Sequence, residues 1–332
     1  MQKGCGVFNR LIRPVLALLL ILLAAPALAQ TSAPAPAAPA DGVLRVRFTP
    51  PLDQPVRYKL TFDQVEDGKP VQFVAVQELR FIREDAGYLM SIRWLTLKID
   101  GQTFDMTKAD LPIPPSLLLL FQPVTLELDA AGKVVRVRDW MKVRQNLINS
   151  APGLAKMLST KPAEQQEMAD FFTKFFTKFT DVPAERAPSL MVEGWPQMLG
   201  LMALEGRAGQ TYAGRRPVET LYVPEPVDYD FQTRFSHAAD GRGVRILTIG
   251  RPDAAGARKV QTGLIDATIE AAPDGESIDR ADMEGFLANP ELAQEYDVTF
   301  DDVTGLPIRA RLVDREKFDG LDNTMTVTFE RQ

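Results

Sequence analysis

Apolar and polar residues alternate with a period of two in segments at both ends of this chain, and this pattern constrains the fold more than any other feature. Residues 56–62 and 325–329 both show it. Successive strand residues point to opposite faces, so each segment predicts a strand with one buried face and one solvated face. Turns containing Gly and Asp, at residues 85–87 and 129–133, separate consecutive segments. Turns this tight join antiparallel strands, so the sequence predicts an antiparallel sheet.

A helical period replaces the alternation between residues 139 and 204. The clearest helix is predicted over Pro162–Phe179, because proline suits a first helical turn and the apolar residues recur at steps of three and four. A second helical segment over residues 189–204 contains Pro196, which should kink the helix or start it afresh. The apolar side chains predicted to line a pocket on these two segments are Met168, Phe171, Phe172, Phe175, Phe176, Phe179, Met191, Trp195, Met198 and Met202.

The predicted fold class is α+β, with a curved antiparallel β-sheet, half-barrel-like, covered by inserted amphipathic helices. A slip in the apolar phase near Trp94 predicts a β-bulge, which bends a sheet. We expect residues 43–332 to form a single domain; a split into two domains near residue 205 is the alternative. The expected order is strands over 43–138, a helical insertion over 139–204, strands over 205–251, a mixed and mainly helical part over 253–293, and strands over 294–332.

The part from residue 253 to residue 293 is open between helix and strand. Apolar residues in its first half recur at helical steps, but Gly263 and several β-branched residues weaken that pattern. Residues 278–294 also favour a helix, with an interruption at Asn289 and Pro290.

Residues 1–29 have the pattern of a signal peptide. Basic residues precede an apolar stretch, which ends in the triplet Ala-Leu-Ala at residues 27–29. We therefore predict cleavage after Ala29 and a periplasmic location for the mature protein. An uncleaved membrane anchor is the alternative, although the apolar stretch is shorter than the ~20 residues that a spanning helix needs. After cleavage no transmembrane anchor is expected, and residues 30–42 form an Ala/Pro-rich linker.

Charge and cysteine content limit the partners of the mature chain. The full chain carries 38 Lys and Arg against 44 Asp and Glu, and three of the bases lie in the signal peptide, so the mature chain has a net charge of −9. A negative balance disfavours nucleic acid as a partner, because phosphate binding needs clustered Lys and Arg. Cys5 leaves with the signal peptide, so the mature chain has no disulfide and depends on its core for stability.

Sequence motifs that carry catalysis or bind cofactors are absent from the chain. There is no nucleophile elbow, zinc-protease helix, phosphate-binding loop or dinucleotide fingerprint. The single histidine, His237, lies beside a predicted hairpin tip and is expected to be solvated. We expect no catalytic residue, cofactor or metal, and we expect the acidic residues at 279–284 and 297–302 to form turns and solvated surface. A carboxylate-dependent hydrolase is a remote alternative, because such enzymes need no motif, but the sequence nominates no acid pair.

Phenylalanine and methionine are concentrated in the helical region. Six of the 11 methionines and five of the 18 phenylalanines lie within residues 141–202. Methionine adapts its shape to varied partners, so a helix pair lined by Phe and Met and facing the sheet can form a pocket for an acyl chain or a similar ligand. Plain core packing is the alternative, because every core helix shows this spacing of apolar residues.

At the level of architecture, the layout resembles the half-barrel carriers that ferry lipoproteins or lipids through the periplasm. The resemblance implies a non-catalytic periplasmic binding or carrier protein for an apolar ligand such as a lipid or an acyl group. The alternative is an envelope interaction or assembly factor without a small ligand, which would use the helical face or the proline-flanked segment Leu117–Phe121 to bind another protein. A continuous apolar cavity beside the helices favours the carrier, and a filled interior favours the interaction factor.

Overall fold

The computed structural model describes residues 42–52, 54–66, 69–99, 101–108, 110–191, 194–220, 223–239, 241–271 and 278–332. The predicted signal peptide and nearly all of the predicted linker lie outside the described residues. The strands are β1 (Val43–Arg45), β2 (Val56–Glu66), β3 (Lys69–Glu84), β4 (Gly87–Ile99), β5 (Gln102–Asp105), β6 (Val124–Leu128), β7 (Val134–Val137), β8 (Glu205–Arg207), β9 (Thr211–Thr220), β10 (Val223–His237), β11 (Val244–Pro252), β12 (Glu291–Phe300), β13 (Pro307–Phe318) and β14 (Leu321–Arg331). The helices are the 3-10 helix η1 (Leu117–Phe121) and the α-helices α2 (Trp140–Leu158), α3 (Pro162–Phe179), α4 (Pro188–Met191), α5 (Trp195–Leu201), α6 (Ala254–Ala271) and α7 (Arg280–Phe286).

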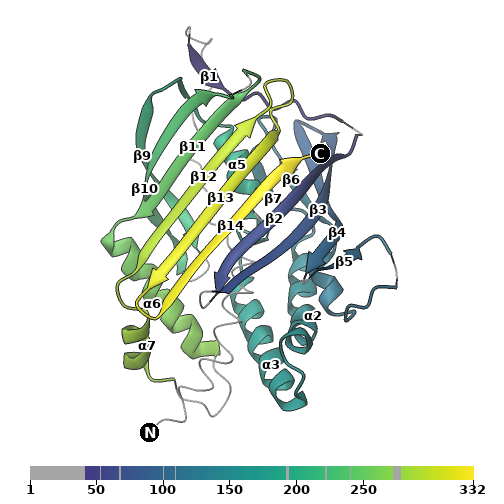
Figure 1. The fold of residues 1–332 in the computed structure, drawn as a ribbon, viewed down its shortest axis with the longest axis vertical. Coiled ribbons are helices and arrows are strands. Elements are labelled where there is room, and N and C mark those ends of the chain that lie inside the picture. Colours follow the sequence, from purple (N-terminus) through teal and green to yellow (C-terminus); the bar gives the residue numbers. More distant parts are fainter. Residues whose placement is uncertain are drawn as a thin grey trace.

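One large antiparallel sheet dominates the described part of the chain. It has 12 strands in the order β7-β6-β4-β3-β2-β14-β13-β12-β11-β10-β9, with β5 paired to β4 beside this path, and it is open rather than closed. β14 pairs with β2, so strands from the two ends of the chain are neighbours, and Figure 1 shows them side by side in yellow and dark blue. The predicted α+β class and the large antiparallel sheet built from both ends of the chain are confirmed.

The period of two decides which side chains of the sheet are buried. In β14 the odd-numbered residues from Asn323 to Phe329 are buried, and the residues between them are partly exposed. We call the face that carries these buried side chains the inner face, and the opposite face the outer face. In β4 the register shifts beside Trp94, where Leu95 is an extra residue, so the predicted β-bulge is confirmed.

The helix α5 lies against the inner face of the sheet. Its first residue, Trp195, is fully buried, and its ring centroid lies 4.8 Å from that of Tyr58 in β2 and 5.1 Å from that of Phe329 in β14. The indole Nε1 donates a hydrogen bond of 3.0 Å to Gln77 Oε1 in β3. One side chain of α5 therefore contacts three neighbouring strands.

A glycine permits the close approach of α5 to the sheet, and the same helix shows that the sheet is curled. Gly194, just before α5, has φ of +91°, and a Cβ at this position would lie 2.5 Å from Leu312 Cδ2 in β13. α5 also contacts the edge strand β7. β7 and β13 are six steps apart in the sheet order, about 29 Å in a flat sheet. Because one short helix reaches both strands, the sheet must curl around it.

The helices α2 and α3 form a hairpin, and their apolar faces pack mainly on each other. α3 begins and ends at the predicted residues, and Pro162 lies in its first turn. The buried residues that surround the apolar face of α3 come from η1, α2 and α6. We call these residues, together with the apolar face of α3, the helical cluster. The sequence predicted that this helix covers the sheet. Helical periodicity shows which face of a helix is buried but not which element buries it, and here α2 is the nearer apolar partner.

The segment left open between helix and strand contains both. α6 is a long helix, whereas α7 ends at Phe286, well before the predicted end at residue 294. Asn289 has φ of +53° and Pro290 lacks a backbone N–H, so the helix cannot continue through them. From Glu291 onward β12 alternates buried and exposed residues.

No helix of the described residues is both long enough and apolar enough to span a membrane.

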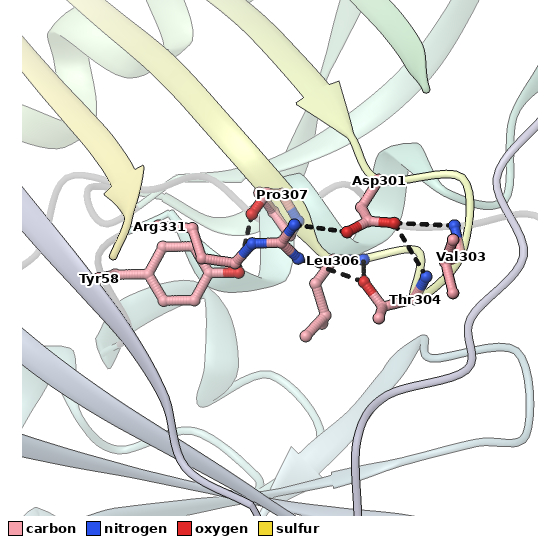
Figure 2. Close-up of polar contacts among 7 residues, drawn as sticks. All are labelled: Tyr58, Asp301, Val303, Thr304, Leu306, Pro307 and Arg331. Atoms are coloured by element: carbon pink, nitrogen blue, oxygen red, sulfur yellow. Dashed lines mark hydrogen bonds and ion pairs between the residues drawn. The ribbon is translucent and has the colours of Figure 1, made fainter. Parts of the chain in front are cut away.

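A group of polar contacts joins the C-terminal strand to the turn between β12 and β13, as Figure 2 shows. Arg331 of β14 forms an ion pair with Asp301 and also donates a hydrogen bond of 3.3 Å to Thr304 Oγ1. The Asp301 carboxylate accepts hydrogen bonds from the backbone N–H groups of Val303 and Thr304. Burial acts to raise the pKa of Asp301, but the hydrogen bonds from Arg331 and the turn outweigh it and hold the pKa below 3.8. The buried Tyr58 hydroxyl donates a hydrogen bond to the first carbonyl of β13.

Breaking this contact group should loosen the end of the sheet. We expect Asp301→Asn and Arg331→Gln each to lower the free energy of unfolding by about 1–3 kcal/mol, and the double variant to cost less than the sum of the two. Because the folded-state pKa of Asp301 is lowered, the contribution of the pair is present above pH 3.8 and disappears as the pH falls below it. Urea unfolding at pH 7 and pH 3 measures both effects. The exposed Arg93→Gln is the control, and strictly additive costs at pH 7 would contradict the coupling.

Candidate functional site

The structure divides the side chains predicted to line one pocket between two clusters. The α3 residues Met168, Phe171, Phe172, Phe175, Phe176 and Phe179 belong to the helical cluster. Trp195, Met198 and Met202 belong to the main core, on or directly after α5. Met191 ends α4, and its side chain lies outside the described part. The structure therefore does not bring these residues together around one space.

The inner face around α5 is filled by the side chains of the protein itself. Trp195, Met198 and Leu201 are fully buried there, and Met202 contributes a methyl group close to Gly132 in the turn between β6 and β7. These large side chains occupy the region between helix and sheet where the sequence predicted a ligand pocket. This part of the interior is therefore filled, and a filled interior is the outcome that favours an interaction factor over a carrier.

A cleft of about 900 Å³ opens elsewhere, between the C-terminal end of α3, the segment 181–190, the start of β10, α6 and the start of α7. α6 packs against β10, and α3 contacts α6, so the cleft is framed by elements that are fixed relative to one another. Its apolar lining residues are Phe179, Val182, Leu190, Val223, Ala255, Ala267 and Ile269. Of the predicted pocket residues whose side chains are described, Phe179 alone lines this cleft.

Charged residues surround the apolar lining, and the bases outnumber the acids. The basic lining residues are Lys178, Arg186, Arg258, Lys259 and Arg280, and the acidic ones are Asp181, Asp266 and Glu270. Each of the three acids already holds a base: Asp181 pairs with Arg144 at 3.3 Å, Asp266 with Arg280, and Glu270 with Lys178. Lys259 pairs with Glu225 on β10 at 3.0 Å. The cleft therefore combines an apolar lining with a rim that has a positive charge balance, in a chain that is negative overall.

A pair of carboxylates lies on the inner face of β13. Asp314 and Glu316 stand between Leu312 and Phe318 in the alternating pattern and are partly buried, with their Cα atoms about 7 Å apart by strand geometry. Neither forms an ion pair with a Lys or Arg of the described residues. Burial raises the pKa of Asp314 to about 7 and that of Glu316 to about 8, and the Asp314 charge adds to the shift of Glu316.

Polar side chains from neighbouring strands surround this acid pair. Asn323 of β14 hydrogen-bonds Glu316, which counters part of the rise in its pKa. Gln64 Nε2 of β2 donates a hydrogen bond of 2.9 Å to Asn323 Oδ1. Burial, with the nearby Asp314 charge, raises the pKa values of Tyr229 and Tyr296 above the ordinary tyrosine value. The acid pair thus sits in a polar region of the inner face that the core apolar residues flank.

Arg216 of β9 is a further charged side chain directed to this region. Its guanidinium lies 3.9 Å from the ring centroid of Phe231, and burial lowers its pKa to about 10. A cation above an aromatic face is attracted by the ring quadrupole, so Phe231 stabilises Arg216 there.

Asp314 and Glu316 were not among the predicted site residues, although the sequence contains a signal for them. Ile308, Ala310 and Leu312 form a pattern of alternate apolar residues in this strand. Continuing it places the two acids on the same face as the core residues, followed by Phe318 on that face. Two acids in phase with core residues are the sequence signal for a buried acid pair.

The other polar residues that the sequence analysis named are either exposed or paired with a basic residue. His237 is exposed at the end of β10. Asp297 forms two hydrogen bonds with Arg245 of the neighbouring strand, and Asp301 holds Arg331. Among the described residues, no group of three or more His, Cys, Asp or Glu side chains is placed to hold a metal ion.

Comparisons with known proteins place the chain in no family. No family model and no curated protein matches it. Among solved structures, a DUF1329 family protein from Desulfovibrio piger is 9% identical, with 83% of this chain and 84% of that chain covered and a TM-score of 0.17. A porin-like protein from Bacteroides uniformis is 9% identical, with 86% and 100% covered and a TM-score of 0.19. MucB in complex with MucA(peri) is 12% identical, with 83% and 89% covered and a TM-score of 0.12. TM-scores this low establish no shared fold, so these likenesses carry no argument about function.

Proposed function

We propose that this protein is a non-catalytic binding or carrier protein for an apolar or amphiphilic ligand, and that the ligand binds in the cleft between α3, α6 and the segment 181–190. The observation that carries the proposal is the cleft itself, about 900 Å³ with an apolar lining. Small-molecule sites in proteins are concave, largely apolar and about 300–1,000 Å³ in volume. The sequence supports the same function, but the proposed site is this cleft instead of the space between helices and sheet.

The periplasmic location is part of the proposal and rests on the sequence of residues 1–29. Basic residues, an apolar stretch and a small-residue triplet favour export and cleavage after Ala29. A carrier of apolar molecules is useful in such a compartment, because apolar molecules do not cross water unaided. An envelope interaction factor is the alternative, and the filled interior around α5 favours it.

Filling the cleft should weaken ligand binding without unfolding the protein. We expect the apolar fluorophore N-phenylnaphthylamine to bind the full mature chain saturably, and Thr262→Trp in α6 to weaken that binding by about tenfold or more, because the indole occupies the site. Fluorescence titration measures the affinity, and circular dichroism checks the fold.

The matched control is Thr103→Trp, which places the same ring on the exposed strand β5. It should leave the affinity unchanged. If the wild-type chain does not bind the fluorophore, or if Thr262→Trp binds as tightly as the wild type, the cleft is not the ligand site and the interaction factor becomes the better proposal.

The acid pair favours carboxylate-dependent hydrolysis as a second candidate function. Such enzymes use two carboxyl groups about 5–9 Å apart, one of them with a raised pKa. The Cα atoms of Asp314 and Glu316 lie about 7 Å apart by strand geometry, and the pKa values of both carboxyl groups are raised. Release of nitrophenol from a panel of nitrophenyl glycosides and esters tests this candidate. Product release that disappears in Asp314→Asn supports it, and equal rates for the wild type and this variant exclude it.

A further inference from the structure

We propose that the cleft selects amphiphiles with an anionic head group, and that Arg258 of α6 binds this group at the rim. The inference rests on the proposed function, because it assigns a ligand class to the same cleft. Its basis is the distribution of partnered and unpartnered charges around the apolar lining.

The acids of the rim are already neutralised by bases. Glu270 holds Lys178, Asp266 holds Arg280, and Asp181 pairs with Arg144 on α2. A cationic ligand that enters the cleft would have to displace one of these bases before it could form an ion pair with a carboxylate. The rim therefore offers a cation no free carboxylate among the described residues that line it.

Arg258 differs from these paired residues. It lines the cleft and is exposed, and its side chain forms no ion pair or hydrogen bond with any described residue. Lys259, the next residue, is held by Glu225 at 3.0 Å. A guanidinium presents several N–H donors in a planar fork that matches a carboxylate or a phosphate, so Arg258 is the available binding group for an anion.

A buried hydroxyl in the wall of the cleft is a second polar group without a partner. Thr220, at the end of β9, lines the cleft, and its Oγ1 is buried without a hydrogen-bond partner among the described residues. A hydroxyl can donate to an anionic oxygen, so Thr220 suits the same head group as Arg258. The apolar floor would then hold the tail, with Phe179 and Ile269 in contact with it.

Three amphiphiles with the same dodecyl tail test the inference: dodecanoate, dodecyl maltoside and dodecyltrimethylammonium, each below its critical micelle concentration. Competition with N-phenylnaphthylamine on the full mature chain gives their affinities. We expect dodecanoate to bind about tenfold more tightly than dodecyltrimethylammonium, and we expect this preference to shrink in high salt.

Variants of Arg258 should change the preference and not the binding of the tail. Arg258→Gln should weaken dodecanoate by about fivefold to tenfold and leave dodecyl maltoside within about twofold. Arg258→Glu should invert the order and favour dodecyltrimethylammonium. Arg309→Gln, on the outer face of β13, is the matched control and should leave all three affinities unchanged.

The possible failures are distinguishable. Equal binding of all three amphiphiles by the wild type, or an unchanged preference in both Arg258 variants, overturns the head-group inference and leaves the proposed function intact. A wild-type chain that binds neither the fluorophore nor any amphiphile overturns the proposed function and the inference together.

Discussion

Replacing Trp195 by alanine is expected to lower the free energy of unfolding by about 4 kcal/mol or more, the largest loss that we expect from any single substitution in the chain. Trp195 is fully buried between α5 and the inner face, and its ring contacts Tyr58 and Phe329. Truncation would leave a cavity among three strands and remove the hydrogen bond to Gln77 Oε1. Urea unfolding followed by far-ultraviolet circular dichroism measures this loss of free energy. In thermal unfolding, Tm should be lower by about 8 °C.

Two further variants separate the causes of that loss. Trp195→Phe keeps most of the ring volume but has no N–H, so it should cost about 1–3 kcal/mol, the cost of the lost hydrogen bond and a smaller cavity. Met141→Ala is the control for truncation at an exposed site of a helix, where 68% of the methionine is accessible, and it should cost under about 0.5 kcal/mol. A Trp195→Ala variant as stable as this control would show that α5 does not hold the curled sheet.

Local patterns predicted the elements of the fold better than the contacts between them. The alternation at residues 56–62 and 325–329 predicted strands from both ends in one sheet, and the bulge beside Trp94 followed from a slip in the same alternation. The range of α3 followed from its spacing and from Pro162. Its packing partner did not, because periodicity contains no information about which apolar surface a helix meets in space.

The candidate site could be predicted only in part, for the same reason. The cleft depends on α6, a helix that the sequence left open, and on segments far apart along the chain that meet there. Of the predicted pocket residues, Phe179 lines it, because it stands at the end of α3 next to α6. The free charge of Arg258 is invisible in the sequence, since only the fold shows that the neighbouring bases have acidic partners.

Neutralising the acid pair should make the protein more stable at alkaline pH. In the double variant Asp314→Asn, Glu316→Gln, we expect the free energy of unfolding at pH 9 to exceed that of the wild type by about 3 kcal/mol or more, and to be nearly equal to it at pH 4. The carboxyl groups are partly buried on the inner face and have no basic partner among the described residues, so burial favours their neutral form. Chemical unfolding between pH 4 and pH 9 measures the difference.

Stability falls with rising pH because the folded state binds the protons of these two carboxyl groups more tightly than the unfolded state does. The ordinary pKa values are 3.8 and 4.5, whereas the folded values are about 7 and about 8. The folded state therefore keeps its protons to higher pH than the unfolded state, and stability falls as the pH rises from about 4 to about 8. The matched control is Asp322→Asn with Glu330→Gln, two exposed acids on the outer face of β14. Its difference from the wild type should not depend on pH in this window, and a pH-independent difference for the inner pair would refute the argument.

The single variants test whether the two carboxyl groups titrate as a unit. The charge of Asp314 contributes to the raised pKa of Glu316, so Asp314→Asn should shift the remaining fall in stability to lower pH. Each single variant then relieves both the burial of its own charge and the repulsion between the pair. At pH 9 the gains of the two single variants should therefore sum to more than the gain of the double variant, because the repulsion is counted twice. Gains that add to the value for the double variant would mean that the groups ionise independently, and would place their carboxylates too far apart to act together in a hydrolase.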